Sequence, residues 1–209
     1  TIMGGGPNHV SNVKPHRESF DPPETPEELM IFIKPPNTLV GHGDTVVLRR
    51  EGDFKHEIEL GVVIGEQCRD VSSEEAMDVV AGFTIVNDVT HPTLARGVHP
   101  FDPRNWGRSK AFDDAAPIGP VIAPPESVPS DAEMELRVNG EVEQSATRAD
   151  LIHPVPDVIA EVSSYLTLEA GDVITTGSPY PLGNLADGDQ VELSIEGIGT
   201  LEHDVDWDV

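Results

Sequence analysis

The stretch His56-Glu57-Ile58-Glu59-Leu60-Gly61-Val62-Val63-Ile64-Gly65 has the alternating pattern of a β-strand, and its second half is wholly apolar. Alternation with a period of two is typical of a half-buried strand, and the apolar run indicates that this strand enters the core. Successive side chains on a strand point to opposite faces, so Glu57 and Glu59 lie on the same face. The pattern therefore predicts two neighbouring carboxylates in a segment that is otherwise buried.

Two carboxylates on one half-buried face repel each other unless a proton or a cation lies between them. A hard divalent cation with oxygen ligands is the simplest way to hold Glu57 and Glu59 together. An exposed polar face on an edge strand is the simpler interpretation of the pair alone. Acidic chains contain such pairs by chance, and Glu133-Met134-Glu135 is another.

The composition is that of a folded, strongly acidic protein. The 209 residues include 38 acidic and 13 basic side chains, which give a formal net charge of -25. Such a charge repels nucleic acid and anionic membranes. No apolar run approaches the ~18 residues of a membrane-spanning helix, and the N-terminus lacks the pattern of a signal peptide. The single cysteine, Cys68, excludes an internal disulfide, so we expect a cytoplasmic protein.

The acidic residues are spread along the whole chain rather than gathered in one tail. A solvated acidic surface suits high salt, where screening makes excess charge cost little. We therefore hypothesise a halophilic source.

We expect a single domain in which an N-terminal arm, residues 1–36, precedes a catalytic unit over residues 37–209. The glycines of Gly4-Gly5-Gly6-Pro7 lack the context of a dinucleotide site and predict a flexible turn. The polar segment after them, with His9 and His16, is bounded by glycine and proline and could form a mobile lid. A disordered surface arm is the alternative.

The rest of the chain predicts more strands than helices, with turn signals at short spacing. This is typical of a β-rich α+β domain of sandwich or roll type with few short helices. Strands are expected over residues 29–33, 45–49, 56–65, 82–90, 118–123, 133–138, 141–146, 172–176, 190–195 and 199–205, and helices over 74–80 and 156–166. Asn139-Gly140 predicts a hairpin between two of the strands.

Several chemistries are excluded by missing motifs. The chain has no Gly-x-Ser-x-Gly elbow, no Walker loop and no His-Glu-x-x-His. Asp88, at the polar end of an apolar strand, could join Glu57 and Glu59 in a site with three carboxylates, and all-oxygen ligands favour Mg²⁺, Mn²⁺ or Ca²⁺ over zinc. The alternative for Asp88 is an ordinary turn residue.

A set of segments, in order from residue 29 to the end of the chain, resembles the fumarylacetoacetate hydrolase family. The segments are Phe32-Ile33-Lys34-Pro35-Pro36, residues 57–65, Glu75-Ala76-Met77-Asp78, residues 81–90, Lys110-Ala111-Phe112-Asp113, Val138-Asn139-Gly140-Glu141, residues 171–177 and Ile195-Glu196-Gly197-Ile198-Gly199. None is specific alone, but together they are. The resemblance implies a mixed β-sandwich roll and a homodimer.

The resemblance also implies roles for individual residues. The ligands of Mg²⁺, or of Mn²⁺ or Ca²⁺, would be Glu57, Glu59 and Asp88, and the cation would stabilise the enolate of a small dicarbonyl or 2-oxo acid. Lys110 matches an active-site lysine that adds positive charge where oxyanion character grows. The residues expected to contact substrate are Lys34, Arg96, Thr176 and Gly177.

The N-terminal segment departs from the family's pattern. Members that cleave C–C bonds carry a lid in which Asn and an aromatic residue precede a His–Glu pair that activates water. If Asn8 is the motif's Asn, the His slot holds Asn12 and the pair is absent. If Asn12 is the motif's Asn, the His slot holds His16 and Glu18 lies one residue short of its slot. The second register fits the distance to Lys34 better.

A second departure lies after Asp88-Val89-Thr90, where the family's usual Ala-Arg is replaced by His91-Pro92. Arg96 is the candidate to replace that arginine in binding the substrate carboxylate.

The sequence therefore predicts a metal-dependent enzyme that hydrolyses a C–C bond in an acylpyruvate-type acid, with His16 and Glu18 activating water and Lys110 assisting. The alternatives keep the metal but change the reaction to decarboxylation of an oxaloacetate-type acid or isomerisation of a 2-hydroxydienedioate. A non-catalytic binding protein is a further alternative.

Overall fold

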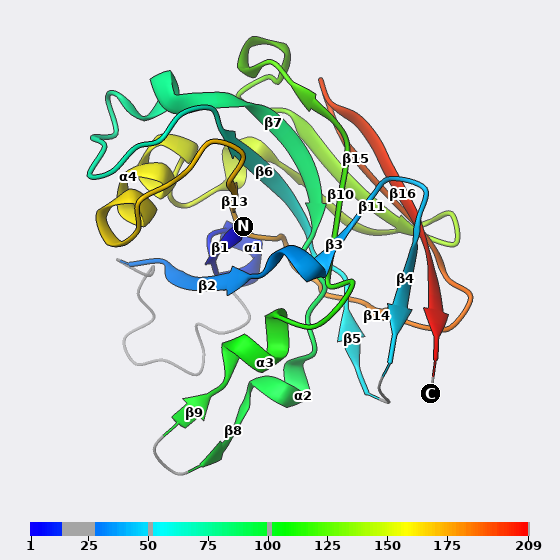
Figure 1. The fold of residues 1–209 in the computed structure, drawn as a ribbon. Helices are drawn as coiled ribbons and strands as arrows, with labels where there is room; N and C mark the ends of the chain where they lie inside the picture. Colours follow the sequence, from blue (N-terminus) through cyan, green and yellow to red (C-terminus); the bar gives the residue numbers. More distant parts are fainter. Residues whose placement is uncertain (14–27, 50–51, 100–101, 209) are drawn as a thin grey trace.

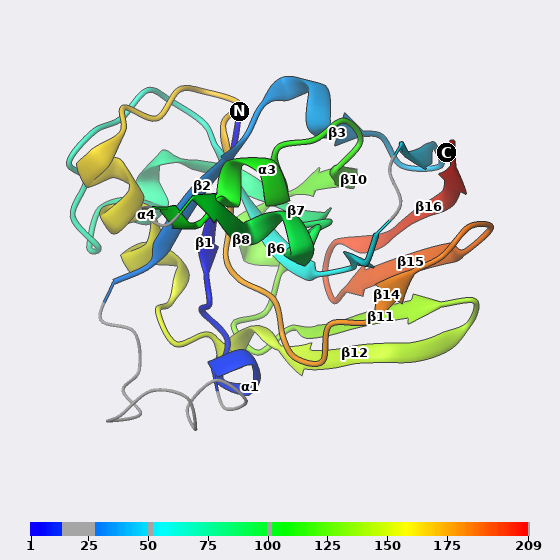
Figure 2. The same ribbon diagram turned by 90° about the horizontal axis from the view of Figure 1, so that it is seen from below.

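The computed structural model describes residues 1–13, 28–49, 52–99 and 102–208. Two mixed β-sheets curl around a common core, and short helices lie at their margins (Figure 1, with a second view in Figure 2). The predicted β-rich sandwich roll with few short helices is therefore confirmed. Among the described residues no helix is both long enough and apolar enough to cross a bilayer.

The larger sheet has seven strands and carries most of the acidic and apolar stretch over residues 56–65. Its order is β2 (Met30–Lys34), β1 (Ile2–Gly6), β13 (Val173–Thr175), β6 (Ile58–Ile64), β7 (Val80–Asn87), β10 (Ala116–Ala123) and β3 (Leu39–Val40). The β1–β13 and β10–β3 pairs are parallel, and the other pairs are antiparallel.

The second sheet has five strands and packs mainly against β7 and β10. Its order is β12 (Glu141–Thr147), β11 (Glu133–Val138), β15 (Gln190–Ile195), β16 (Gly199–Trp207) and β4 (Thr45–Leu48). The predicted Asn139-Gly140 hairpin joins β11 to β12, and both of its residues have the positive φ that this turn requires, 52° and 82°.

The remaining elements are short. Two-stranded ribbons pair β14 (Asn184–Leu185) with β5 (Phe54–Lys55), and β8 (Arg96–His99) with β9 (Asp102–Arg104). The α-helices are α1 (Val10–Val13), α2 (Pro92–Ala95), α3 (Trp106–Lys110) and α4 (Val155–Tyr165), and the 3-10 helices are Pro36–Thr38, Ala76–Val79, Pro125–Ser127 and Arg148–Asp150. The helix expected over residues 74–80 is thus only the 3-10 turn at Ala76–Val79.

The two faces of β6 have different surroundings. Ile58, Leu60 and Val62 belong to the core between the two sheets, whereas Val63 belongs to a small apolar cluster on the opposite face. Because side chains alternate along a strand, Glu59 shares the face of Val63 and points away from the five-stranded sheet.

The glycine run at the N-terminus is a strand and not the flexible turn expected from the sequence. β1 pairs with β2 on one side and with β13 on the other. A Cβ at Gly4 would lie 1.9 Å from Cζ of Phe32, so the missing side chain makes room for this ring. Close packing of a ring against backbone is a common reason for glycine inside a strand.

The expected buried strand at residues 29–33 is β2, which lies at the edge of its sheet. Ile33 is 48% exposed, whereas Lys34 at the end of the strand is fully buried. Both β1 and β2 are hydrogen-bonded into the central sheet. Residues 14–27 lie outside the described residues, and the division into an arm and a catalytic unit stays a prediction.

Candidate metal centre

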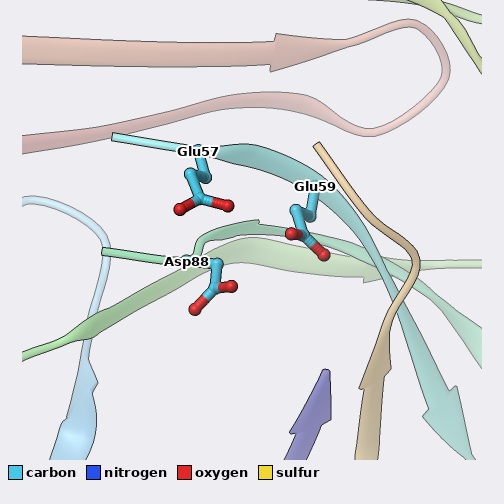
Figure 3. Close-up of side chains that lie close together, drawn as sticks. All are labelled: Glu57, Glu59 and Asp88. Carbon is cyan, nitrogen blue, oxygen red and sulfur yellow. The ribbon is translucent and has the colours of Figure 1, made fainter. Parts of the chain in front are cut away.

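Three buried carboxylates meet where β6 begins and β7 ends. Each of Glu57, Glu59 and Asp88 offers one oxygen, and these oxygens all lie within 4.8 Å of one another (Figure 3). In the β6–β7 register Ile58 lies opposite Asn87, and the backbone N–H of Asp88 donates to the carbonyl of Glu57 at 2.9 Å. The antiparallel pairing therefore brings Asp88 beside the two glutamates.

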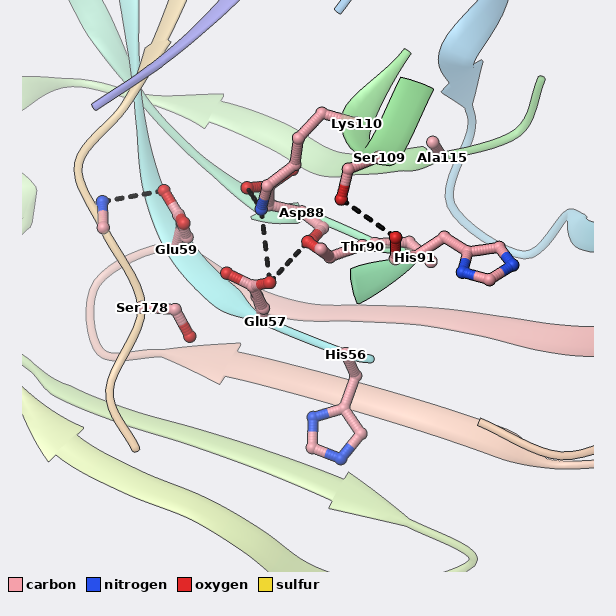
Figure 4. A network of polar contacts seen from close by, with 12 residues as sticks. His56, Glu57, Glu59, Asp88, Thr90, His91, Ser109, Lys110, Ala115 and Ser178 are labelled. Atoms are coloured by element: carbon pink, nitrogen blue, oxygen red, sulfur yellow. Dashed lines mark hydrogen bonds and ion pairs between the residues drawn. The ribbon is translucent and has the colours of Figure 1, made fainter. Parts of the chain in front are cut away.

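Two lysines partly balance these carboxylates. The amine of Lys110, at the end of α3, donates to Oε1 of Glu57 at 3.2 Å and to Oδ2 of Asp88 (Figure 4). The amine of Lys34 lies 2.8 Å from Oδ1 of Asp88. Asp88 therefore lies between two ammonium groups, while Glu59 has no ion-pair partner among the described residues.

The amine of Lys34 is closed off from any ligand. It donates to the backbone carbonyls of Val89, Lys110 and Ala115 at 3.0, 2.9 and 2.8 Å, and it also forms the ion pair with Asp88. An ammonium group has three hydrogens, so four oxygen neighbours leave none for a substrate. This placement favours a role in orienting Asp88 over the substrate contact expected from the sequence.

Neutral donors complete the shell of the two glutamates. The hydroxyl of Thr90 donates to Oε1 of Glu57, and the backbone N–H of Gly177 donates to Oε2 of Glu59 at 2.7 Å. The side chain of Asn87 accepts the backbone N–H of Glu57 at 2.9 Å. These contacts fix the carboxylates in place in a buried position.

Burial changes the acidity of the centre. Burial, and after it the charge of Asp88, raise the pKa of Glu59 to about 8. Burial also raises the pKa of Glu57, against the charge of Lys110. For Asp88 burial acts in the same direction, but Lys110 and Lys34 outweigh it and hold its pKa below the ordinary value. The two glutamates therefore resist ionisation unless another cation joins them.

These features fit a hard divalent cation. The donors are carboxylate oxygens from three residues, and these oxygens converge. The raised pKa values of Glu57 and Glu59 indicate that these two carboxylates have too little positive charge beside them. Oxygen-only donor sets suit Mg²⁺, Mn²⁺ or Ca²⁺. The role of Glu57, Glu59 and Asp88 as metal ligands stays a prediction.

The loop after β13 borders the centre. The Thr176 hydroxyl donates to the Leu60 carbonyl at 3.1 Å, so it is occupied by backbone. Gly177 has a φ of 99°, and a Cβ there would lie 2.8 Å from Cβ of Asn8. Asn8 donates to the Thr176 carbonyl at 2.9 Å, and Asn12 donates to the Ser178 carbonyl at 3.1 Å.

Three residues expected at the site are not placed there by the structure. His16 and Glu18 lie outside the described residues. Arg96 begins β8, and the position of its side chain is likewise outside the description. Their roles in activating water and in binding a carboxylate stay predictions.

Sequence reasoning missed several polar residues around the centre. Thr90 lies within residues 81–90, one of the segments that resemble the family. This position could have indicated that its hydroxyl lies near the centre. Asn87 and Gln144 stand in no catalytic pattern, and only the packing of distant strands reveals their contacts.

Comparison with known proteins shows the family to which the chain belongs. The family model described as "Fumarylacetoacetate (FAA) hydrolase C-terminal" matches residues 1–206. The chain belongs to the fumarylacetoacetate hydrolase family. Among curated relatives, the Escherichia coli 4-hydroxyphenylacetate degradation bifunctional isomerase/decarboxylase is 42% identical over 204 residues, which cover 96% of this chain and 46% of that protein.

Solved structures of the family have the same fold. The 5-carboxymethyl-2-hydroxymuconate delta-isomerase of Mycobacterium smegmatis is 34% identical with a TM-score of 0.87, over 100% of this chain and 79% of that one. The fumarylpyruvate hydrolase of Pseudomonas aeruginosa, solved with Mn²⁺ and pyruvate, is 30% identical with a TM-score of 0.85, over 99% and 89%. Family members thus include hydrolases, isomerases and decarboxylases.

Proposed function

We propose that this protein is a divalent-metal-dependent enzyme that stabilises the enolate of a small 2-oxo acid. The observation that carries the proposal is the buried triad of Glu57, Glu59 and Asp88 with the amine of Lys110 beside it. Mg²⁺ or Mn²⁺ is the expected cation, with Ca²⁺ as a third candidate, and the Mn²⁺ and pyruvate bound by the Pseudomonas relative support both cation and substrate class. When bound, the cation would supply Lewis-acid stabilisation of negative charge on the substrate oxygens.

Lys110 supplies a fixed positive charge. Burial alone would lower the pKa of its amine, but Asp88, Glu57 and Glu59 outweigh burial and raise it. The amine therefore stays an ammonium at neutral pH and stabilises an oxyanion rather than accepting a proton. Its position 4.7 Å from the centroid of the Phe32 ring adds a cation–π contact that keeps it in place.

The described residues favour isomerisation or decarboxylation as the reaction. Both need a stabilised enolate and do not require an activated water molecule. His56 precedes Glu57, but its Nε2 lies 2.6 Å from Oε2 of Glu143. Its ring points away from the three carboxylates (Figure 4).

The register of the lid motif in which Asn8 is the first residue also supports a reaction without an activated water molecule. Asn8 is fully buried and its amide donates to the backbone carbonyls of His153 and Thr176, which supports the register that starts at Asn8. In that register the His slot holds Asn12, which cannot act as a base. The sequence had favoured the other register, with His16 and Glu18 as the water-activating pair.

Hydrolysis of a C–C bond, the reaction expected from the sequence, is the second candidate. The fumarylpyruvate hydrolase from Pseudomonas aeruginosa resembles this chain over 99% of its length. If His16 lies over the triad when substrate is bound, it can act as the general base that hydrolysis requires.

The deciding experiment is an assay with Mg²⁺ or Mn²⁺ in molar salt on three substrates: an acylpyruvate, oxaloacetate, and 2-hydroxyhepta-2,4-diene-1,7-dioate. Metal-dependent turnover of either of the last two that is lost in Glu59→Gln supports the proposal. Cleavage of the acylpyruvate that is lost in His16→Ala would replace it with hydrolysis. No turnover by a protein that binds the metal would favour a non-catalytic relative.

The outer face of the seven-stranded sheet supports the expected homodimer. A groove of about 470 Å³ on this face is lined by side chains that carry no charge, among them Leu39, Val121 and Ile122, each 44–59% exposed. In a chain with a net charge of -25, an uncharged exposed face is an interface candidate. We expect a dimer in light scattering and a monomer for Val121→Asp. The cytoplasmic location stays a prediction.

A further inference from the structure

A β-bulge places two adjacent residues of β12 against the strand that carries the candidate metal centre. In the β11–β12 ladder Leu136 pairs with Gln144 and Arg137 pairs with Val142, so Glu143 is an extra residue on β12. Adjacent residues on a regular strand point to opposite faces, and a bulge re-aims one of them. Here the Glu143 carboxylate reaches His56, and the Gln144 amide reaches the neighbouring backbone of Ile58.

Gln144 is buried and uses its full hydrogen-bonding capacity. Its Oε1 accepts the backbone N–H of Ile58 at 3.0 Å and lies 3.3 Å from Nδ1 of His56. Its Nε2 donates to Oγ of Ser178 at 3.1 Å and to the carbonyl of Pro179. An amide side chain offers two acceptor and two donor positions, and all four are occupied.

These contacts join two segments that border the centre. Ile58 lies between Glu57 and Glu59, so its backbone sets the position of both glutamates. Ser178 follows Gly177, whose N–H donates to Oε2 of Glu59 at 2.7 Å. Gln144 therefore lies between the start of β6 and the loop that completes the shell of Glu59.

We propose that Gln144, re-aimed by the bulge at Glu143, is a positioning residue that sets the spacing between β6 and the Thr176–Pro179 loop. The inference rests on the proposed function for its effect on metal and substrate. Its effect on the loop stands on the hydrogen bonds alone. The His56–Glu143 contact is a second tie between β12 and the start of β6.

A merely structural role would lower stability and leave the folded site unchanged. A positioning role predicts that the folded variant has a looser loop and a weaker site. Loss of both hydrogen bonds from Nε2 frees the segment that carries Gly177, and Glu59 then loses a well-aimed donor. Because hydrogen bonds to charged groups contribute about 1.5–3 kcal/mol, we expect roughly a tenfold or larger loss of cation affinity.

The test compares Gln144→Met, which keeps the length of the side chain without its polar atoms, with Gln144→Glu, which keeps an acceptor for the Ile58 N–H. Glu141→Gln, an exposed change on the same strand, is the control. The measurements are amide hydrogen exchange of residues 176–178, calorimetric Mn²⁺ affinity of the metal-free protein, and the Tm. Activity assays then separate KM from kcat.

We expect faster exchange in residues 176–178 and weaker Mn²⁺ binding in Gln144→Met, a smaller effect in Gln144→Glu, and no change in Glu141→Gln. Unchanged exchange and affinity in folded Gln144→Met would overturn the proposal. If that variant does not fold, Ser178→Ala, which removes the contacts of Oγ with Gln144 and with the Pro179 carbonyl, decides it by the same exchange measurement. If the wild-type protein binds no Mn²⁺, the proposed function fails, while the exchange arm still decides the role of Gln144.

Discussion

The side-chain nitrogen of Asn87 lies 3.0 Å from Nε2 of His203, and this contact joins the two sheets behind the candidate metal centre. Asn87 ends β7 and accepts the backbone N–H of Glu57, whereas His203 belongs to β16 of the other sheet. Nδ1 of His203 lies 3.2 Å from the Asp204 carbonyl. These partners fit a neutral imidazole that donates through Nδ1 and accepts through Nε2.

Acid is expected to weaken this link. Burial lowers the pKa of His203 to about 4, from 6.5 in an unfolded chain. The unfolded state therefore binds the proton more readily, so the stability from the neutral ring is complete above about pH 6.5 and is lost as the pH falls toward 4.

The measurement for His203 is the free energy of unfolding by urea between pH 4 and 7. His203→Gln removes the titrating group and keeps an acceptor for Asn87. We expect the free energy of unfolding of this variant to fall less steeply with acid than that of the wild type, and the difference in slope should correspond to up to about one proton. Equal slopes in both proteins would contradict the prediction.

Metal binding is expected to release a proton from Glu59. Its pKa is raised to about 8 in the metal-free protein, so a cation that binds at pH 6 must displace this proton. Affinity for Mg²⁺ should rise with pH and level off above about pH 8. Calorimetry in two buffers of different ionisation enthalpy measures the protons released, about one at pH 6 and close to none at pH 9. An affinity that does not change over this range would refute the assignment.

The same raised pKa has the opposite consequence for the stability of the metal-free protein. Protonated Glu59 favours the folded state, so its contribution is complete below about pH 4.5 and is lost as the pH rises through about 8. Saturating metal is expected to remove that loss, which thermal unfolding with and without Mg²⁺ at pH 6 and 9 can measure.

Two glycines of β1 form a matched pair. A Cβ at Gly4 would meet the Phe32 ring at 1.9 Å, whereas a Cβ at Gly6 has no neighbour within 4 Å. Gly4→Ala must displace the ring that supports Lys110, and overpacking of this kind costs about 1–3 kcal/mol. Gly6→Ala should be close to neutral in denaturant unfolding. Equal losses in the two variants would mean that the ring moves freely.

Salt is expected to stabilise the protein. With a net charge of -25, self-repulsion falls as screening increases, so the free energy of unfolding should rise from dilute to molar KCl. Glu133, Glu135 and Glu196 line one groove of the five-stranded sheet, and their triple change to Gln should reduce the salt dependence. Stability that is independent of salt would end the halophilic hypothesis.

Periodicity predicted much of the fold. The strands β11 and β15 begin and end at the residues expected, and β6 places Glu57 and Glu59 on one face as a period of two requires. The hairpin at Asn139-Gly140 followed from turn chemistry. These features depend on local sequence, which explains why the sequence was sufficient for them.

The features that the sequence did not predict depend on contacts between distant segments. β1 consists largely of glycine, so only the Phe32 ring packed against it explains the strand. The burial of Lys34 requires carbonyls from three other segments, and the position of Asp88 requires the β6–β7 register. Gln144 reaches the site only through a bulge, which leaves no motif in the sequence.

The amine of Lys34 lies where no ligand can touch it, yet its charge enters the electrical balance of the centre. Together with Lys110 it offsets two of the three carboxylates, so one negative charge is left uncompensated once Glu59 has lost its proton. A divalent cation would reverse the sign and leave one positive charge, which the anion of a 2-oxo acid would cancel. The centre would then become neutral when the substrate binds and not when the metal binds. We therefore expect the metal to raise the affinity for the substrate, and the substrate to raise the affinity for the metal.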